Sequence, residues 1–251
     1  MGTNIKILRA FFAYLKRELI VNAGPLGDFL YKTSEDIRVI ALSPQRLNFL
    51  IHDKDFENSL SPRLQIWKDM FVFGCTTALR FSDISKLNHT HLETVNDDVY
   101  LCVRAQKTQM LSRVFLPHYA KDILHKYRRR KLSLFPPISK VNYNKAIKKI
   151  ALLAGWKEEI SKTRNRQGIA IPHYRNSAKK QHYRFCDLVS SHTMRRTAIT
   201  TMLRMGMHEM NVRIISGHTA HSASFYQYVQ HSESFMNEEM NKAFAKLDTF
   251  K

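Results

Sequence analysis

The sequence predicts a mainly α-helical domain with a small antiparallel β-sheet, an α+β arrangement. Apolar residues recur at helical spacing in several segments, and the clearest stripe runs from Leu64 to Ala78. Residues 98–116 change to the alternating pattern of strands. With 251 residues, of which 44% are apolar, the chain is long enough to bury a core.

The first third of the chain is predicted to contain three helix starts. Residues 4–20 show helical apolar spacing, and the glycine- and proline-containing stretch behind them is typical of a linker that ends near residue 40. Ser43-Pro44 and Ser61-Pro62 each combine a capping side chain with a proline suited to the first helical turn. The helix that starts at Pro44 should reach about Ile51.

The middle of the chain is predicted to contain a β-hairpin followed by two helices. Apolar and polar residues alternate over 98–116, and a turn is expected near Thr108–Met110. Helices are expected over residues 117–130 and 141–154, because Pro136-Pro137 interrupts the helical pattern between them.

The segment 161–186 holds seven lysines or arginines and no acidic residue. Gly168 and Pro172 disfavour a continuous helix, so an extended basic hairpin is expected there. Four helices are then predicted, over about residues 192–205, 208–216, 222–230 and 234–246, with Gly206 and Gly217 ending the first two.

The charge of the chain points to a polyanionic partner. Its 40 lysines and arginines exceed its 21 acidic residues, which gives a formal net charge of +19. Such a surface favours a nucleic acid, although a basic solubility surface or a ribosome-associated protein can have the same composition.

Several other classes of protein are disfavoured. The three cysteines, Cys75, Cys102 and Cys186, form no CxxC pair, so we expect a reducing compartment and neither a disulfide framework nor a metal site. The sequence has no signal peptide and no apolar run of the ~20 residues that cross a bilayer, so no membrane partner is expected.

The stretch Ser191-His192-Thr193-Met194-Arg195-Arg196-Thr197 is the strongest candidate for chemistry. Ser191 can cap a helix whose first turn holds His192, with Arg195 on the same face. The N–H groups and positive potential of a helix start favour a phosphate, and a guanidinium can bind two of its oxygens. The structural alternative is that His192 merely caps the helix while Arg195 forms a salt bridge.

A second candidate stretch runs from Gly217-His218 to Phe225-Tyr226-Gln227-Tyr228-Val229. Gly217 can end a helix and place His218 at a tight corner that faces the same pocket, and a tyrosine further on can supply a nucleophilic oxygen. A phenol has an ordinary pKa near ~10, so guanidiniums and a histidine would have to help remove its proton. The alternative is that both tyrosines are ordinary packing residues.

A third stretch, Thr77-Ala78-Leu79-Arg80-Phe81-Ser82-Asp83-Ile84, places Arg80 just past the buried helical stripe. A second guanidinium in the pocket would neutralise another phosphate oxygen, and Asp83 could orient a basic partner. The alternative for Asp83 is an acid that favours the start of a short helix.

Together these stretches resemble the active-site signature of the tyrosine recombinases, the phage integrase family. ALRFSD is similar to the family's first arginine box, SHTMRRT to its HxxR box, and SGHTAHSASFYQYV to its box from GH to tyrosine. The resemblance covers about residues 40–230 and is closest to integrases of conjugative transposons and other mobile elements. It implies the fold of the family's catalytic domain. The implied catalytic residues are Arg80, Lys107, His192, Arg195, His218 and Tyr228, with Asp83 behind them.

Two of these assignments have competitors. Lys107 matches the family only through its context, a β-hairpin turn with the sequence RAQKTQ, and Arg104 competes with it. The nucleophile is Tyr228 or Tyr226, which lie ten and eight residues after His218, whereas most family members use the ninth. Tyr228 is preferred because FYQYV resembles the ending found in the mobile-element members.

The resemblance implies phosphoryl transfer without a metal or nucleotide cofactor. Tyr228 would attack a DNA phosphodiester and form a 3′-phosphotyrosyl bond, while Lys107 protonates the leaving 5′-hydroxyl. Arg80 and Arg195 would stabilise the transition state, and the two histidines would hydrogen-bond the phosphate or accept the tyrosine proton.

Double-stranded DNA is the implied partner. Candidate contacts to its backbone form two basic groups, Arg128, Arg129, Arg130 and Lys131 in one, and Lys162, Arg164 and Arg166 in the other. A solvated basic face is the alternative for both groups.

The resemblance also implies an organisation. Residues 1–39 would be the remnant of an N-terminal core-binding helical domain with its linker, and residues 40–251 the catalytic domain. Family members assemble as tetramers on paired DNA sites, so a homotetramer is implied, with accessory DNA-bending or directionality factors and a location at the nucleoid in a bacterial cytoplasm. The C-terminal helix would pack on its own chain or on a neighbouring protomer.

DNA integration by a mobile-element recombinase is the preferred function. The alternatives are a chromosome-dimer resolvase or DNA invertase of the same family, a type IB topoisomerase, and a catalytically silent DNA-binding module.

Overall fold

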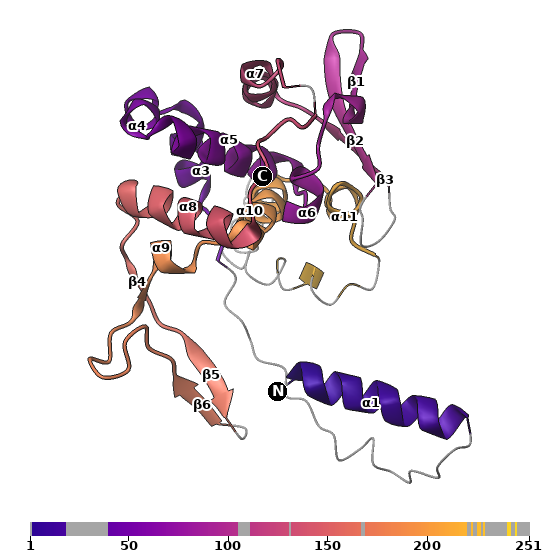
Figure 1. The fold of residues 1–251 in the computed structure, drawn as a ribbon, viewed down its shortest axis with the longest axis vertical. Helices are drawn as coiled ribbons and strands as arrows, with labels where there is room; N and C mark the ends of the chain where they lie inside the picture. The colour runs from indigo at the N-terminus through magenta and orange to yellow at the C-terminus, as the bar shows by residue number, and fades with distance from the viewer. Residues whose placement is uncertain are drawn as a thin grey trace. The chain divides into compact units, whose positions relative to one another are not determined.

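The computed structural model describes residues 2–18, 40–104, 111–130, 132–166 and 169–219. It also describes Ser222, Phe225, Tyr226, Tyr228, Met240, Asn241 and Phe244. Contacts divide the chain into two units, one with residues 1–38 and 161–182 and the other with residues 39–160 and 183–251. The second unit contains the hydrophobic core and is mainly helical, as predicted (Figure 1).

The smaller unit contains helix α1 and a β-hairpin. α1 covers Gly2–Arg17, close to the predicted helix over residues 4–20. Strands β5 (Thr163–Arg166) and β6 (Ile169–Pro172) pair in antiparallel fashion. The extended hairpin expected in this acid-free segment is therefore confirmed for these strands.

The end of that basic segment differs from the prediction. Strand β7 (Tyr183–Arg184) pairs with β4 (Glu159–Ile160) of the larger unit instead of extending the hairpin. Helix α9 (Phe185–Leu188) follows at once, because Phe185 and Cys186 are apolar and are buried in the core.

The larger unit begins with three helices, α3 (Pro44–His52), α4 (Lys54–Ser59) and α5 (Pro62–Thr77). The side chain of Ser43 accepts a hydrogen bond from the N–H of Arg46 at 3.3 Å, so the predicted cap of α3 is confirmed. Pro62 stands in the first turn of α5, as predicted, but Ser61 makes no side-chain cap bond. α4 was not predicted; the carboxylate of Asp53 caps it by accepting from Phe56 N–H at 2.7 Å.

The sheet of the larger unit has three antiparallel strands in the order β1-β2-β3. They are β1 (Leu92–Val95), β2 (Asp98–Arg104) and β3 (Leu111–Phe115), preceded by the short 3-10 helix η1 (His89–His91). Leu101 and Val103 of β2 are buried, as their alternation predicted, whereas β1 was missed. The predicted turn at Thr108–Met110 lies outside the described residues.

Helices α6 (Phe81–Ile84), α7 (His118–Lys126) and α8 (Lys140–Leu153) surround α5. α8 matches the helix predicted over 141–154, with Ser139 as its cap. α7 is shorter than predicted, because the backbone leaves the helix at Tyr127, whose hydroxyl donates to Asp69 at 2.9 Å.

Helices α10 (Ser191–Arg204) and α11 (Glu209–Ser216) match the predicted spans, and Gly206 and Gly217 follow them with positive φ. The predicted cap of α10 is wrong by one position, since Ser190 is the cap and donates its N–H to the Thr193 hydroxyl at 3.0 Å. Beyond them, the described residues are also helical at Phe225, Tyr226, Tyr228, Met240, Asn241 and Phe244; the rest of the two predicted C-terminal helices lies outside the described residues.

Helix α5 packs against α10 at the centre of the larger unit, and α11 lies beside β3 (Figure 1). The contact is close because Gly74 has no side chain: a Cβ built there would lie 2.4 Å from the Met194 sulfur. The larger unit also contains a second, smaller cluster of buried apolar residues. Its members are Ala78, Ala198, Ile199, Leu203, Val212, Phe225 and Tyr228.

Candidate active site

The end of α5, the first turns of α10 and the corner after α11 meet at Arg195. The guanidinium of Arg195 is buried, with 3% of the residue exposed. Its Nη1 donates to the backbone oxygen of Ala78 at 2.8 Å, and its Nη2 lies 3.2 Å from His218 Nε2 and 3.3 Å from His218 Nδ1. Segments far apart in the sequence therefore share one buried cation.

Ala78 ends α5 in the left-handed region, with φ 56° and ψ 15°. A residue with a Cβ adopts this conformation at a cost of ~1–2 kcal/mol, so the surrounding structure must hold it. The turn sends the carbonyl of Ala78 to Arg195 and is followed closely by Arg80, which is half-buried at the start of α6.

The corner after α11 fixes His218. Gly217 has φ 60°, and the N–H of His218 donates to the carbonyl of Arg213 at 3.0 Å, which closes the helix end. The ring of His218 is buried and lies between Ser216, whose Oγ is 2.8 Å from Nδ1, and the guanidinium of Arg195. The predicted role of Gly217 in turning the chain is confirmed.

The two candidate tyrosines lie in different surroundings. Tyr228 is buried, and its ring centroid is 5.9 Å from that of His218 and 6.3 Å from that of Phe225. Tyr226 is 49% exposed, and the guanidinium of Arg213 lies 4.9 Å from its ring centroid. Tyr228 is thus next to the cluster that holds Arg195, and Tyr226 faces solvent.

His192 stands in the first turn of α10 with an exposed face, one turn before Arg195 and Arg196. The predicted cap Ser191 instead uses its N–H to donate to the Asn144 side chain of α8 at 2.7 Å. One of the N–H groups at the start of α10 is therefore already hydrogen-bonded within the protein. On the same helix the buried Nε of Arg196 has no hydrogen-bond partner among the described residues.

Burial and positive charge together perturb the ionisable groups of this cluster. Burial, followed by the charge of Arg80, lowers the pKa of Arg195 to about 10, although Tyr228 and Asp83 act in the opposite direction. Burial, followed by the charges of Arg195 and Arg80, lowers the pKa of His218 to about 3. At neutral pH the guanidinium stays charged and His218 is neutral.

His192 is neutral at pH 7 for a similar reason. Partial burial, followed by the charges of Arg196, Arg195 and Lys140, lowers its pKa to about 4. Several cations therefore lie close together beside a histidine, an arrangement that an oxyanion would stabilise.

Sequence reasoning did not single out four contributors to this cluster. Arg196 could have been found, because it lies one helical turn after His192. Lys140 comes from another helix, and neither the carbonyl of Ala78 nor the hydroxyl of Ser216 has a signal in the sequence, since their roles depend on tertiary contacts.

The structure describes two of the remaining predicted residues, Asp83 and Arg104, but not Lys107. Asp83 is buried in α6 and raises the pKa of Arg195, so its negative charge favours the charged guanidinium. Arg104 is exposed at the end of β2. Lys107 lies outside the described residues, and its assignment stays a prediction.

The candidate DNA contacts fall in both units. Arg128, Arg129 and Arg130 are exposed after α7 in the larger unit, and Lys162 and Arg164 are exposed in the smaller one. Lys131 and the side chain of Arg166 lie outside the described residues. The two groups stay predictions as binding residues.

Among the described residues, no group of three or more histidine, cysteine or acidic side chains could hold a metal ion. No described helix has the length and apolar character needed to cross a bilayer.

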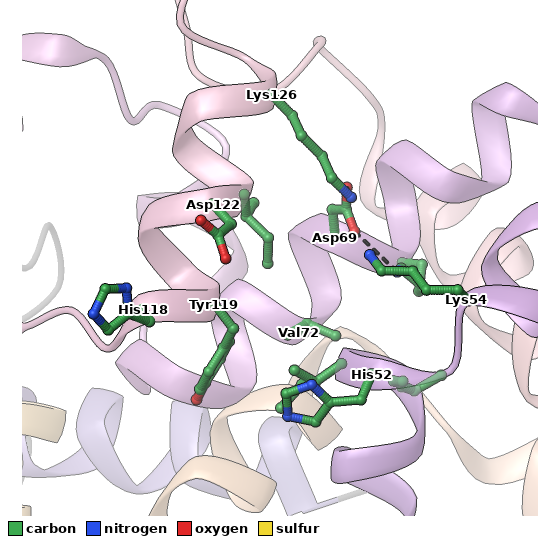
Figure 2. A pocket seen from close by; sticks show the side chains of 12 residues that line it. His52, Lys54, Asp69, Val72, His118, Tyr119, Asp122 and Lys126 are labelled. Atoms are coloured by element: carbon green, nitrogen blue, oxygen red, sulfur yellow. Dashed lines mark hydrogen bonds and ion pairs between the residues drawn. The ribbon is translucent and has the colours of Figure 1, made fainter.

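A separate cavity of about 290 Å³ lies between α3, α5 and α7 (Figure 2). In Figure 2, Lys126 extends toward Asp69, which it meets at 3.2 Å, and His118 lies at the other end of α7. Glu57 and Asp69 also pair with the buried Lys68, each at 3.2 Å. These charges compensate one another, so the cavity lacks the excess of cations found around Arg195.

No sequence-family model matches this chain, and no curated protein matches it by sequence. Solved structures do match it. A Tn1549 transposon integrase fragment in complex with transposon right end DNA is 16% identical, with a TM-score of 0.63, over 96% of this chain and 78% of that one. A lambda integrase dimer bound to a COC′ core site is 14% identical, with a TM-score of 0.56, over 90% of this chain and 73% of that one.

The XerH site-specific recombinase, in a post-cleavage complex with palindromic difH substrate, is 12% identical with a TM-score of 0.58. The match covers 84% of this chain but 55% of that one, so this chain spans about half the length of XerH. At such identities the likeness establishes the fold.

Proposed function

We propose that this chain, which has the fold of the tyrosine recombinase catalytic domains, is a site-specific DNA recombinase of the integrase type. The observation that carries the proposal is the contact of Arg195 with His218 beside the buried ring of Tyr228. A guanidinium, a neutral histidine and a phenol in one cluster suit phosphoryl transfer to a tyrosine.

In the proposed reaction the Oη atom of Tyr228 attacks the phosphorus of a DNA phosphodiester. The new bond is a 3′-phosphotyrosyl ester, and the bond to the 5′-oxygen breaks. Arg80 and Arg195 hold the non-bridging oxygens as negative charge builds up on them. The proton of Tyr228 passes to His218, and Lys107 is our candidate for the acid that protonates the 5′-oxygen. A 5′-hydroxyl from another strand then reverses the step and rejoins the DNA.

The proposed substrate is double-stranded DNA, held by the exposed groups around Arg128–Arg130 and Lys162–Arg164. The net charge of +19 supports a polyanionic partner. The matched integrase, recombinase and lambda integrase structures contain DNA, which supports the same choice. We further propose a homotetramer on paired DNA sites, in which residues 40–251 form the catalytic domain.

Covalent capture tests this proposal and identifies the target site in the same experiment. The protein is mixed with a library of duplexes that carry one nick inside a randomised segment. Cleavage close to the nick releases a short fragment, so the 5′-hydroxyl needed for religation is lost and the phosphotyrosyl complex accumulates. Complexes that survive SDS are isolated, and their DNA is sequenced to find the site.

We expect the wild-type protein to yield covalent complexes with an enriched sequence, and Tyr228→Phe to yield none. Tyr226→Phe is the matched control and should still yield them. Capture by Tyr228→Phe but not by Tyr226→Phe would show that the nucleophile is the other tyrosine. DNA binding without any covalent complex would favour the catalytically silent module instead.

A further inference from the structure

Ser216 is the last residue of α11, and only 2% of it is exposed. Its Oγ lies 2.6 Å from the carbonyl oxygen of Val212 and 2.8 Å from Nδ1 of His218. A longer contact of 3.3 Å reaches the carbonyl of Arg213. The hydroxyl therefore sits between carbonyl acceptors on its own helix and the ring nitrogen of a histidine.

The direction of these hydrogen bonds follows from counting protons. A hydroxyl has one proton to donate, and a carbonyl oxygen can only accept, so the short contact makes Ser216 the donor to Val212. Its lone pairs then face His218, and Nδ1 must carry the proton that it donates to Ser216. The reverse assignment would leave the Val212 contact without a proton.

The guanidinium of Arg195 lies over the ring and does not select a tautomer. Nη2 is at nearly equal distances from the two nitrogens, 3.2 Å from Nε2 and 3.3 Å from Nδ1. An atom at such a point does not lie along the in-plane lone pair of either nitrogen. The choice of tautomer therefore rests on the contacts of Ser216 with Val212 and with Nδ1.

We propose that Ser216 is a positioning residue that holds His218 in the Nδ1-protonated tautomer, which leaves Nε2 as the ring nitrogen with a free lone pair. The charged and titratable groups around the ring are Arg195 and His192 from α10, Arg80 from the start of α6, Arg213 from α11, and the phenol of Tyr228. Every cation in this set disfavours a charged imidazole, so the ring is neutral at neutral pH and one of its nitrogens is unprotonated.

The consequence for catalysis rests on the proposed function. With Nδ1 protonated and bonded to Ser216, Nε2 is the ring nitrogen that can accept a proton. When the bond between Tyr228 Oη and phosphorus forms and the bond to the 5′-oxygen breaks, the tyrosine proton moves to Nε2. The 5′-oxygen takes its proton from the separate acid of the mechanism. The Nδ1 proton stays on His218 and donates to Ser216 throughout, so Nε2 is the nitrogen of His218 that can act as the base.

Nitrogen NMR of the DNA-free protein tests the tautomer directly. The chain is labelled with ¹⁵N-histidine, and the signals that disappear in His218→Asn identify His218. Protonated and bare ring nitrogens differ widely in ¹⁵N shift, so we expect a protonated Nδ1 and a bare Nε2 at pH 7 in the wild type. A protonated Nε2 in the wild type would overturn the proposal, and this measurement does not depend on recombinase activity.

Variants of Ser216 test its role. In Ser216→Ala we expect a mixture of tautomers and a rate of covalent capture lower by about 10-fold to 100-fold on the captured duplex. Ser216→Thr keeps the hydroxyl and should restore both readouts. A Ser216→Ala protein with the wild-type tautomer and rate would refute the inference while leaving the recombinase proposal intact. A wild type with the expected tautomer but no Tyr228-dependent capture would instead refute the proposed function.

Discussion

Arg195 donates a hydrogen bond from Nη1 to the backbone oxygen of Ala78 at 2.8 Å, across a sequence separation of 117 residues. This bond joins the left-handed end of α5 to the centre of the cationic cluster. The fork of a guanidinium allows Nη2 to face His218 at the same time. One side chain thus aligns the segment that carries Arg80 with the corner that carries His218.

A lysine cannot make both contacts, so Arg195→Lys should lose the alignment while keeping the charge. We expect the rate of covalent capture to fall by at least about 100-fold, or ~2.7 kcal/mol of transition-state stabilisation. Binding of the captured duplex should change by less than about threefold. The control is Arg204→Lys, an exposed arginine of the same helix, which should behave as the wild type. Equal losses in rate and binding would mean that Arg195 only attracts DNA.

The charge of Arg196 should be visible in the titration of His192. After partial burial, Arg196 is the largest cause of the lowered pKa of His192, which is about 4. Arg196→Ala should therefore raise this pKa toward the ordinary value of 6.5. The ¹⁵N-histidine spectrum followed over pH measures the change, with Arg204→Ala as a charge-matched control. If both variants titrate alike, Arg196 does not face His192.

The close contact of α5 with α10 should make Gly74 sensitive to substitution. In Gly74→Ala the new Cβ would lie 2.4 Å from Sδ, 2.9 Å from Cγ and 3.3 Å from Cβ of Met194. The sulfur can move but the Met194 Cβ cannot, so we expect a loss of about 1–3 kcal/mol in the free energy of unfolding. Urea denaturation measures it. In a Met194→Ala background the same substitution should cost much less, and an equal cost would show that Met194 is not the obstacle.

The sequence predicted the long helices well because their signals are local. Apolar spacing located α3, α5 and α8 within a few residues, and the Ser-Pro pairs marked the starts of α3 and α5. The short elements α4, β1 and β4 were missed, since two to six residues offer too little periodicity. The misassigned cap of α10 has a similar cause: two adjacent serines are equivalent in sequence, and only the contact of Ser191 with Asn144 distinguishes them.

The site residues that belong to sequence motifs could be predicted from the sequence. The boxes pointed to Arg195, His218 and Tyr228, which the structure brings together. The spacing from His218 did not decide whether Tyr226 or Tyr228 is the nucleophile, because the two tyrosines lie only two residues apart in the same aromatic stretch. Burial separates them, with 4% of Tyr228 and 49% of Tyr226 exposed. The hydroxyl of Ser216 was beyond sequence reasoning, since its hydrogen bond depends on the turn at Gly217.

The exposed arginines after α7 should contribute to DNA affinity in a salt-dependent manner. If each of Arg128, Arg129 and Arg130 neutralises one phosphate, replacing all three by alanine should lower the slope of log K against log salt by about 2.7 in magnitude, or ~0.9 per contact. Fluorescence anisotropy with the captured duplex gives the slope. Lys54→Ala is the control for net charge, because this lysine pairs with Glu57 at 2.9 Å. An unchanged slope in the triple variant would show that these arginines do not contact DNA phosphates.

The buried charges beside the cavity should make the fold sensitive to acid. Burial alone would raise the pKa of Glu57, but hydrogen bonds from Lys126 and Lys54 and the charge of Lys68 outweigh it and lower the pKa to about 2. An acid with a depressed folded-state pKa stabilises the fold above its unfolded value of 4.5, and this contribution is lost as the pH falls from 4.5 toward 2.

We therefore expect the free energy of unfolding to decline through this window, with about 1–2 kcal/mol of the decline due to Glu57 once solvent screening is allowed for. Glu57→Gln should be less stable than the wild type at pH 7 and should show a flatter decline below pH 4.5. Glu159→Gln is the matched control, since this exposed acid of β4 is outside the network. The two variants are compared by urea denaturation from pH 7 to pH 3. Parallel curves for wild type and Glu57→Gln would show that the lysines do not hold Glu57 ionised.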